Sequence, residues 1–256
     1  MLRSIILLLL LFLLQLSTAK AESLTLGYFV LGPHIYANAE GQAQGPLPEF
    51  LTEHIGPSMG VTFNLVNMPL ARILKTMKEG QIAGAALFGH TSARAEDFSY
   101  PSNSYISMHP VITVLNQHPL TQIESVDDIA NLSIGYVKGA IVSPFMKSND
   151  IVFTEIYGNN TWERNIQRLL KGHIDAAYSP IYANMSYVAG KMNLLDSIRI
   201  IRLPEAPMKL YSLFSKHKNF KHLALAKRYD RAFERINGKA LYQKIYTRHY
   251  GSINSE

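Results

Sequence analysis

Residues 79–85 read Glu-Gly-Gln-Ile-Ala-Gly-Ala, and residues 171–177 read Lys-Gly-His-Ile-Asp-Ala-Ala. Both stretches leave a helical pattern through a glycine and enter, after an isoleucine, a run of small residues typical of a buried strand. Strand and helix patterns also alternate before the first stretch, at 24–29, 46–60, 61–66 and 70–77. This alternation indicates a largely parallel sheet covered by helices, and its echo predicts two similar α/β lobes.

The second half of the chain repeats this order of elements. Strand patterns at 133–137 and 151–156 precede a helix that begins after Asn160. Asn160 and Glu163 have the spacing of a capping box. Trp162 lies on the apolar stripe of this helix, which favours a place in the core over a role as a ligand platform.

No linker rich in Gly, Ser or Pro separates the two halves, so we expect strands to cross between the lobes, at 111–115 and at 211–214. An apolar stripe on the last long helix would return the C-terminus to the first lobe. The predicted organisation is therefore a first lobe formed by residues 22–112 and 211–256, and a second lobe formed by residues 113–210.

Residues 1–21 are predicted to be a secretory signal peptide. Arg3 precedes an unbroken apolar run of ten residues, 5–14, and Ala19-Lys20-Ala21 has the small-x-small pattern of a cleavage site. A transmembrane helix needs about 18–20 apolar residues, and a lipoprotein would need a cysteine at this site. An uncleaved anchor is the alternative. An exported chain with no cysteine fits a bacterial periplasm.

Composition excludes several classes of protein. The 256 residues are 47% hydrophobic and 17% charged, which excludes a disordered chain. No cysteine, phosphate-binding glycine loop or His-Glu-x-x-His motif is present, so no cofactor and no metal are expected. Residues 56–60 match G-x-S-x-G, but they follow a helix and precede a strand, which is the wrong context for a nucleophilic serine.

The formal charge of +6 is concentrated near the C-terminus. Residues 211–256 carry ten Lys or Arg and three Asp or Glu. Such a segment could bind nucleic acid. For an exported protein we expect a solvated helix face instead, and no nucleic-acid partner.

The stretch from Gly89 to Ser99 carries the main functional signal. A buried strand ends at its start, and Thr91 can cap a following helix. Arg94 then falls at the third helical position, where a cation beside the positive helix end costs about 0.3–1 kcal/mol unless an anion is present. Ligand crevices lie at the carboxyl ends of strands in open α/β sheets, and a guanidinium suits a carboxylate. The alternative is a surface Arg94 paired with Glu96 or Asp97.

Thr91-x-x-Arg94, followed by Asp97-Phe98-Ser99-x-Pro101, resembles a T-x-x-R…DFS-x-P stretch of family 3 bacterial extracellular solute-binding proteins, the amino-acid receptors of ABC importers. Residues 125–129, 135–139 and 171–176 resemble three further motifs of this family, and the resemblance extends over roughly 24–250. It implies a type II periplasmic-binding-protein-like α/β fold: two lobes, each a mostly parallel sheet flanked by helices, with two crossing strands between them.

The resemblance also implies a set of ligand-binding residues. Arg94 would hold the carboxylate of a solute enclosed between the lobes. The other expected residues are Thr91, Phe29, His34, Tyr36 and Phe88 from the first lobe, and Gly139, Ala140, Tyr178 and Ser179 from the second.

Three positions depart from the family pattern. Ala140 stands where a Ser or Thr is usual, Pro180 where an Asp would hold an α-ammonium group, and Gly89 where a Ser is usual. A buried ammonium without a counter-charge is costly, so an ordinary α-amino acid is not the expected solute.

The predicted function is therefore that of a monomeric periplasmic solute-binding protein. It would capture a small carboxylate-bearing solute for an ABC importer without catalysis. Two alternatives stay open on the same fold. One is a sensory or structural domain with a degenerate pocket. The other is an enzyme resembling cyclic-acid dehydratases, for which Glu49 and His90 are the candidate general acids.

Overall fold

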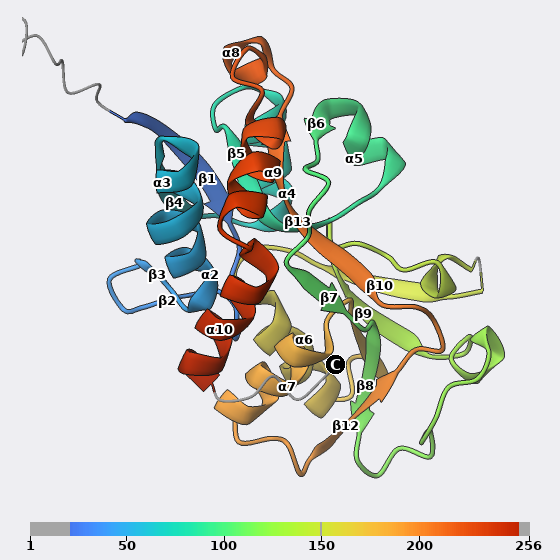
Figure 1. Ribbon diagram of the computed structural model, residues 1–256. Helices are drawn as coiled ribbons and strands as arrows, with labels where there is room; N and C mark the ends of the chain where they lie inside the picture. The colour runs from blue at the N-terminus through green and yellow to red at the C-terminus, as the bar shows by residue number, and fades with distance from the viewer. Residues whose placement is uncertain (1–20, 149, 251–256) are drawn as a thin grey trace, which may run out of the picture.

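The computed structural model describes residues 21–148 and 150–250, which form two lobes that each contain a central sheet (Figure 1). The predicted signal peptide lies outside the described residues, apart from Ala21. Within the described part of the chain, no helix is long and apolar enough to cross a membrane.

The sheet of the first lobe has the order β4-β1-β5-β13-β6, and β7 also pairs with β13. Its strands are β1 (Glu22–Tyr28), β4 (Val61–Asn67), β5 (Gly84–Gly89), β6 (Phe98–Ser99), β7 (Ile106–Met108) and β13 (Met208–Ser215). A small separate hairpin, β2 (Tyr36–Ala37) and β3 (Ala43–Gln44), follows β1.

The sheet of the second lobe has the order β10-β9-β11-β8-β12. Its strands are β8 (Val111–Leu115), β9 (Ser133–Val137), β10 (Val152–Ile156), β11 (Ala176–Ser179) and β12 (Ile198–Arg202). Both sheets therefore begin with the same arrangement, in which the first parallel strand lies between the second and the third.

The sheets are less parallel than the sequence analysis predicts. β4, β1 and β5 are parallel in one lobe, as are β10, β9 and β11 in the other. The remaining strands of both sheets join in antiparallel pairs. Several of these strands lie next to a crossing between the lobes. Their direction is therefore set by where the chain enters or leaves a lobe, and not by a strand–helix–strand repeat.

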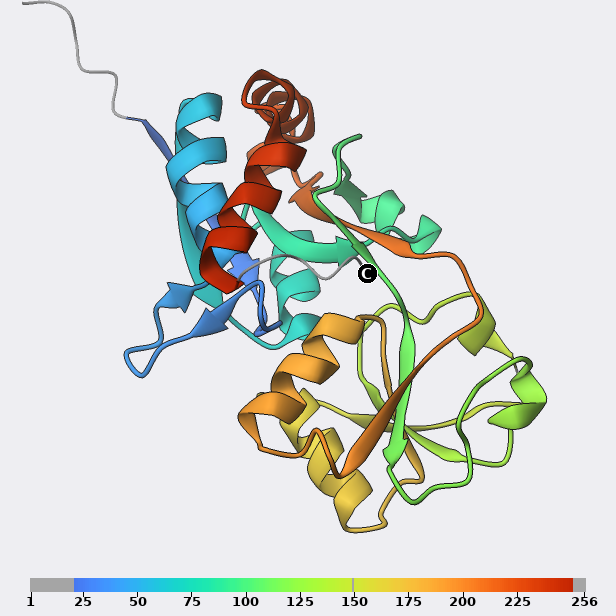
Figure 2. The ribbon, with the colours of Figure 1, turned by 60° about the horizontal axis from the view of Figure 1, so that its bottom comes forward.

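The chain crosses between the lobes twice, and Figure 2 shows the green and orange crossing segments. The first crossing lies between Met108 and Val111, and the second between Arg202 and Met208. The predicted crossing strands lie within single sheets instead: Val111–Leu115 pairs with β12, and the strand containing residues 211–214 pairs with β5 and β6. The absence of a flexible linker predicted the crossings but could not show which sheet each strand joins.

Helices cover both sheets. In the first lobe these are α2 (Pro46–Glu49), the π-helix η1 (Phe50–Ile55), α3 (Gly56–Met59), α4 (Leu70–Lys78) and α5 (Ser92–Asp97). The second lobe has α6 (Thr161–Leu170), α7 (Tyr182–Lys191) and the 3₁₀ turns η2 (Val126–Asp128) and η3 (Phe145–Lys147). The predicted helix over 46–60 is therefore continuous, with a π-helical middle.

The predicted capping box of α6 does not form. Asn160 is the N-cap residue, but its φ of 50° is left-handed and its side chain makes no capping hydrogen bond. An N-cap side chain reaches the helix from an extended backbone, so the left-handed conformation removes the cap that the residue types favour.

The C-terminal segment packs on the first lobe and contains three helices, α8 (Lys218–Lys221), α9 (Leu225–Arg235) and α10 (Gly238–Tyr250). α9 contacts α3 and β13 and buries Leu225, Tyr229 and Phe233. α10 contacts α2, η1 and α9, as its position in Figure 1 shows. The predicted apolar stripe is therefore a core face.

A tyrosine supports an irregular point in β5. Leu87 has a φ of 66°, which is strained for a bulky side chain. The register of the partner strand shifts between Tyr211 and Leu213, near this point. The Leu87 N–H donates to Tyr105 Oη at 3.2 Å, and the Tyr105 side chain is buried.

We predict that Tyr105→Phe lowers the free energy of unfolding by about 1–3 kcal/mol, because a buried N–H that loses its acceptor retains its desolvation cost. Urea unfolding measures this change. Tyr157→Phe is the matched control, since Tyr157 is 73% exposed and its hydroxyl can be replaced by water. Equal stabilities of Tyr105→Phe and wild type would contradict the prediction.

Candidate functional site

Arg94 is placed at the interface of the lobes by a buried strand and a capped helix. β5 ends at Gly89, and the Thr91 Oγ1 accepts a hydrogen bond from the Arg94 N–H at 3.2 Å. Thr91 is thus the N-cap of α5, as the sequence predicts. A capped helix fixes the direction in which Arg94 leaves the backbone.

The Arg94 guanidinium bridges the two lobes through backbone carbonyls. Nη1 donates to the Gly89 oxygen at 2.9 Å, and Nη2 donates to the Gly139 oxygen of the second lobe at 2.7 Å. Its Cζ lies 5.3 Å from the centroid of the Phe88 ring, within the range of a cation–π contact.

No carboxylate in the described part of the chain forms an ion pair with Arg94. Asp97, one of the two acids that could have paired with it, binds the Lys78 Nζ at 2.8 Å. Burial lowers the pKa of Arg94, yet an arginine remains charged at neutral pH. Among the described residues, this partly buried cation contacts carbonyl and aromatic groups but no counter-charge.

The cavity beside Arg94 is small and mainly apolar. Its volume is about 20 Å³, which suffices for roughly one water molecule. A Cβ built on Gly89 would lie 2.6 Å from the Ile141 Cδ1, so Ile141 of the second lobe occupies the space in front of β5. The lining residues are Phe29, Leu31, Leu70, Leu87, Phe88, Gly89, Arg94, Met108, Ala140, Ile141, Trp162, Pro180, Ile181 and Leu210.

A larger chamber of about 420 Å³ adjoins this cavity between the lobes and shares Phe29, Leu70 and Trp162 with it. Its volume lies within the usual range for small-molecule sites. Arg72, Lys138 and Glu163 supply its charged groups. The chamber thus offers charged groups of both signs, whereas Arg94 is the one charged residue among the described residues that line the small cavity.

Two tyrosines hold the second-lobe loop that meets Arg94. The Tyr136 hydroxyl donates to the Ala140 oxygen at 2.7 Å. The Tyr178 hydroxyl donates to the Ile141 oxygen and accepts from the Ser143 N–H, both at 3.1 Å. Burial raises the pKa of Tyr178 far above its usual range, so this hydroxyl keeps its proton.

The structure brings only some of the predicted residues together. Phe29, Phe88, Arg94 and Ala140 line the small cavity, and Gly139 contributes its carbonyl. Thr91 and Tyr178 do not line the cavity: Thr91 caps the helix that carries Arg94, and Tyr178 holds the loop that carries Ile141. Ser179 is buried and bonds to the backbone of Ile181 instead.

His34 and Tyr36 lie away from Arg94. The His34 Nδ1 is 2.7 Å from Tyr242 Oη of α10, so this ring faces the C-terminal helix. Tyr36 stacks on Tyr187 of α7, with ring centroids 6.2 Å apart. Tyr187 also packs where a Cβ on Gly32 would lie, 2.0 Å from its ring, so Tyr36 belongs to a second contact between the lobes.

Sequence reasoning missed Leu70, Trp162 and Ile141 as lining residues. Leu70 and Trp162 stand at the starts of α4 and α6, soon after parallel strands. The carboxyl ends of such strands usually face the ligand, so the positions of Leu70 and Trp162 in the sequence could have identified them as lining residues. Ile141 follows the Gly139 turn, and nothing in its residue type indicates contact with Gly89.

Residues 30–252 match the family described as bacterial extracellular solute-binding proteins, family 3. The chain belongs to this family. Among the curated proteins, none matches the sequence.

Solved structures similar to this family member confirm its type II fold. An ancestral arginine-binding protein bound to arginine has a TM-score of 0.72 at 18% identity, and the match covers 90% of this chain and 98% of that one. A putative L-cystine ABC transporter protein from Listeria monocytogenes has a TM-score of 0.71 at 18% identity, covering 92% and 98%. A histidine kinase sensor domain has a TM-score of 0.73 at 15% identity, covering 91% and 97%.

We predict that His34 makes the stability of this protein pH-dependent. Burial lowers the pKa of His34 to about 3, while an unfolded histidine titrates near 6.5. Between these values the unfolded state binds the extra proton, so stability falls as the pH falls. From pH 7 to pH 5 the loss from this residue should be about 2 kcal/mol.

Urea unfolding of wild type and His34→Gln at both pH values tests this prediction. Between pH 7 and pH 5, the free energy of unfolding should fall by about 2 kcal/mol less in His34→Gln than in wild type, because glutamine does not titrate. His173→Gln, at an exposed position, should behave as wild type. The same loss in all three proteins would show that His34 does not cause the dependence.

Proposed function

We propose that this protein is exported and binds a small carboxylate-bearing solute between its lobes, which an ABC importer then receives, without catalysis. The family supports solute binding, and the small-residue site at 19–21 supports cleavage of a signal peptide. Glu49 and His90, the candidate general acids, do not line the cavity at Arg94, which favours binding over an enzymatic role.

The observation that carries this proposal is the Arg94 guanidinium, partly buried at the junction of the lobes with no acidic partner among the described residues. Neutral carbonyl oxygens satisfy two of its N–H groups. A carboxylate would replace them with charge-assisted hydrogen bonds, which are roughly twice as strong as those of neutral groups.

The solute must enter while the lobes are apart. Gly139 occupies Nη2 of Arg94, and Ile141 fills the space at Gly89. When the lobes separate, both groups withdraw and the guanidinium faces the cleft. A solute that contacts both lobes then stabilises the closed form by its differential affinity.

The surroundings of Arg94 favour a solute without an α-ammonium group. None of the described residues that line its cavity is acidic, and Ala140 and Pro180 offer no side-chain acceptor. Glu163 lines only the outer chamber. An ammonium on the carbon next to the carboxylate would therefore be desolvated without a counter-charge, while the body of the solute could extend into the chamber.

A sensory or structural domain is the second candidate function. The contact between Arg94 and Gly139, together with a cavity of about 20 Å³, favours this role. The guanidinium that would hold a carboxylate is then bound by a carbonyl of the protein itself. A similar sensor-domain fold exists. Failure of every carboxylate to bind wild type would favour this second function.

We predict that Arg94→Ala weakens binding of the solute about ten- to hundredfold, because a hydrogen bond to a charged group contributes about 1.5–3 kcal/mol. Arg94→Lys should restore only part of the affinity, since a lysine lacks the planar fork. Calorimetry with paired acids that share one side chain and carry either an α-hydroxyl or an α-ammonium group measures both affinity and solute class.

Arg231→Ala, at an exposed position of α9, is the matched control and should bind as wild type. Tighter binding of the α-ammonium member of each pair would overturn the assigned solute class. Equal affinity of Arg94→Ala and wild type would overturn the role of Arg94.

A further inference from the structure

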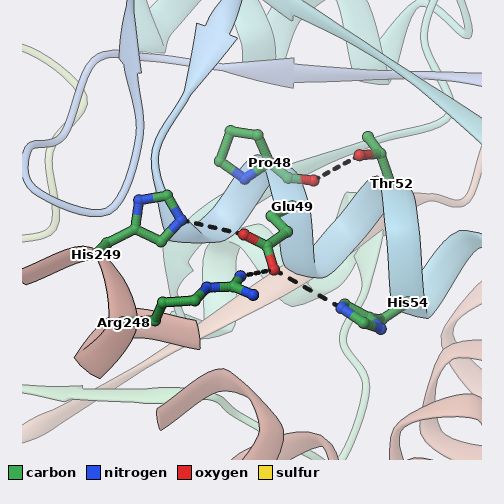
Figure 3. Close-up of polar contacts among 6 residues, drawn as sticks. All are labelled: Pro48, Glu49, Thr52, His54, Arg248 and His249. Carbon is green, nitrogen blue, oxygen red and sulfur yellow. Dashed lines mark hydrogen bonds and ion pairs between the residues drawn. The ribbon is translucent and has the colours of Figure 1, made fainter. Parts of the chain in front are cut away.

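A cluster of polar side chains lies where the end of α10 meets the helices α2 and η1, outside both cavities between the lobes (Figure 3). Glu49 is at its centre. The Glu49 Oε2 is 3.1 Å from His249 Nε2, and the Glu49 Oε1 is 3.9 Å from His54 Nε2. The Glu49 side chain is only 17% exposed, whereas Glu53 and Arg248 around it reach solvent.

The π-helix explains why these residues of the first lobe converge. In an α-helix, residues five apart point about 140° away from each other. The π-helical turn Phe50–Ile55 has hydrogen bonds five residues apart, which places His54 on the face of Glu49. Glu53 shares this face, and one donor atom from each of the three residues lies within 4.8 Å of the others.

The donor set has the chemistry of a transition-metal site. π-helical turns occur frequently at functional sites. Zinc sites combine imidazole nitrogens and carboxylate oxygens, with bonds of about 2.0–2.2 Å, so neighbouring donors lie about 3.3 Å apart. The His54 Nε2 lies 3.9 Å from one Glu49 oxygen, and the His249 Nε2 lies 3.1 Å from the other. Glu49, Glu53 and His54 form the compact group, and the His249 ring would have to turn toward it to reach the same ion.

Arg248 competes for the same carboxylate. Its Nη2 forms an ion pair with Glu49 Oε1. The His249 ring lies against the other carboxylate oxygen, so both oxygens of Glu49 already have a partner. Because the Arg248 side chain is 64% exposed, it can turn into solvent when a metal ion binds.

We propose that Glu49, Glu53 and His54 bind a divalent transition-metal ion of the zinc class, with His249, which contacts the second Glu49 oxygen, turning in as the fourth ligand. The ion would link the end of α10 to α2 and η1 within the first lobe. This site does not depend on the solute proposed above, because none of its ligands lines the cavities between the lobes. The scattered spacing of these residues in the sequence gives no metal motif.

Calorimetric titration of tag-free, chelator-treated mature protein with Zn²⁺ tests this proposal. One ion should bind per chain and raise the melting temperature. His54→Ala and His249→Ala should each weaken binding at least about tenfold, since loss of even an indirect partner of a metal ligand costs about 10–100-fold. Arg248→Ala should strengthen binding roughly tenfold, because Glu49 loses its competing cation.

These opposite effects separate a metal site from a simple network of ion pairs. His173→Ala, an exposed histidine of the second lobe, is the matched control and should bind Zn²⁺ as wild type does. Circular dichroism establishes that each variant is folded, and the visible absorption of Co²⁺ in the site reports its geometry. Absence of saturable binding at micromolar Zn²⁺, or unchanged affinity in both histidine variants, would overturn the proposal.

Discussion

The junction of the lobes depends on how one partly buried guanidinium finds its hydrogen-bond partners. Arg94 has no acidic partner among the described residues, so its N–H groups bind a carbonyl of its own strand end and a carbonyl of the opposite lobe. A cation that loses its water requires such contacts. The apolar side chains around it exclude water and strengthen them. The contact with Gly139 joins the two lobes, and in the proposed function it occupies the place that a carboxylate would take.

A strained backbone residue, Leu87, lies close to the contacts of Arg94. Leu87 lines the Arg94 cavity with a φ of 66°, and Tyr105 supplies the hydrogen bond that its displaced N–H requires. Residues in sparsely populated backbone regions persist only where surrounding packing fixes them. On the other lobe, Tyr136 and Tyr178 fix the loop that carries Gly139. Each lobe thus presents a backbone carbonyl from a supported segment, and the guanidinium joins the two.

The C-terminal helices join the first lobe at a second place, a cluster of polar side chains. They follow the second crossing of the chain, and they pack on α2, η1 and α3 of the first lobe. The π-helical turn between α2 and α3 aligns Glu49 with His54, and α10 brings Arg248 and His249 to the same carboxylate. The polar cluster therefore joins segments about 200 residues apart in the sequence, on the lobe that also carries Arg94.

The sequence by itself determined the features that depend on neighbouring residues. The alternation of strands and helices, the Thr91 cap and the position of Arg94 after a buried strand all follow from local patterns, and the structure contains them. The tertiary structure decided which sheet each strand joins, how His34 meets α10, and that Ile141 fills the space at Gly89. Residue types alone also left open the left-handed backbone of Asn160 and the π-helical turn, because asparagine is compatible both with an extended cap and with a left-handed conformation and the tertiary context can override a local helix preference.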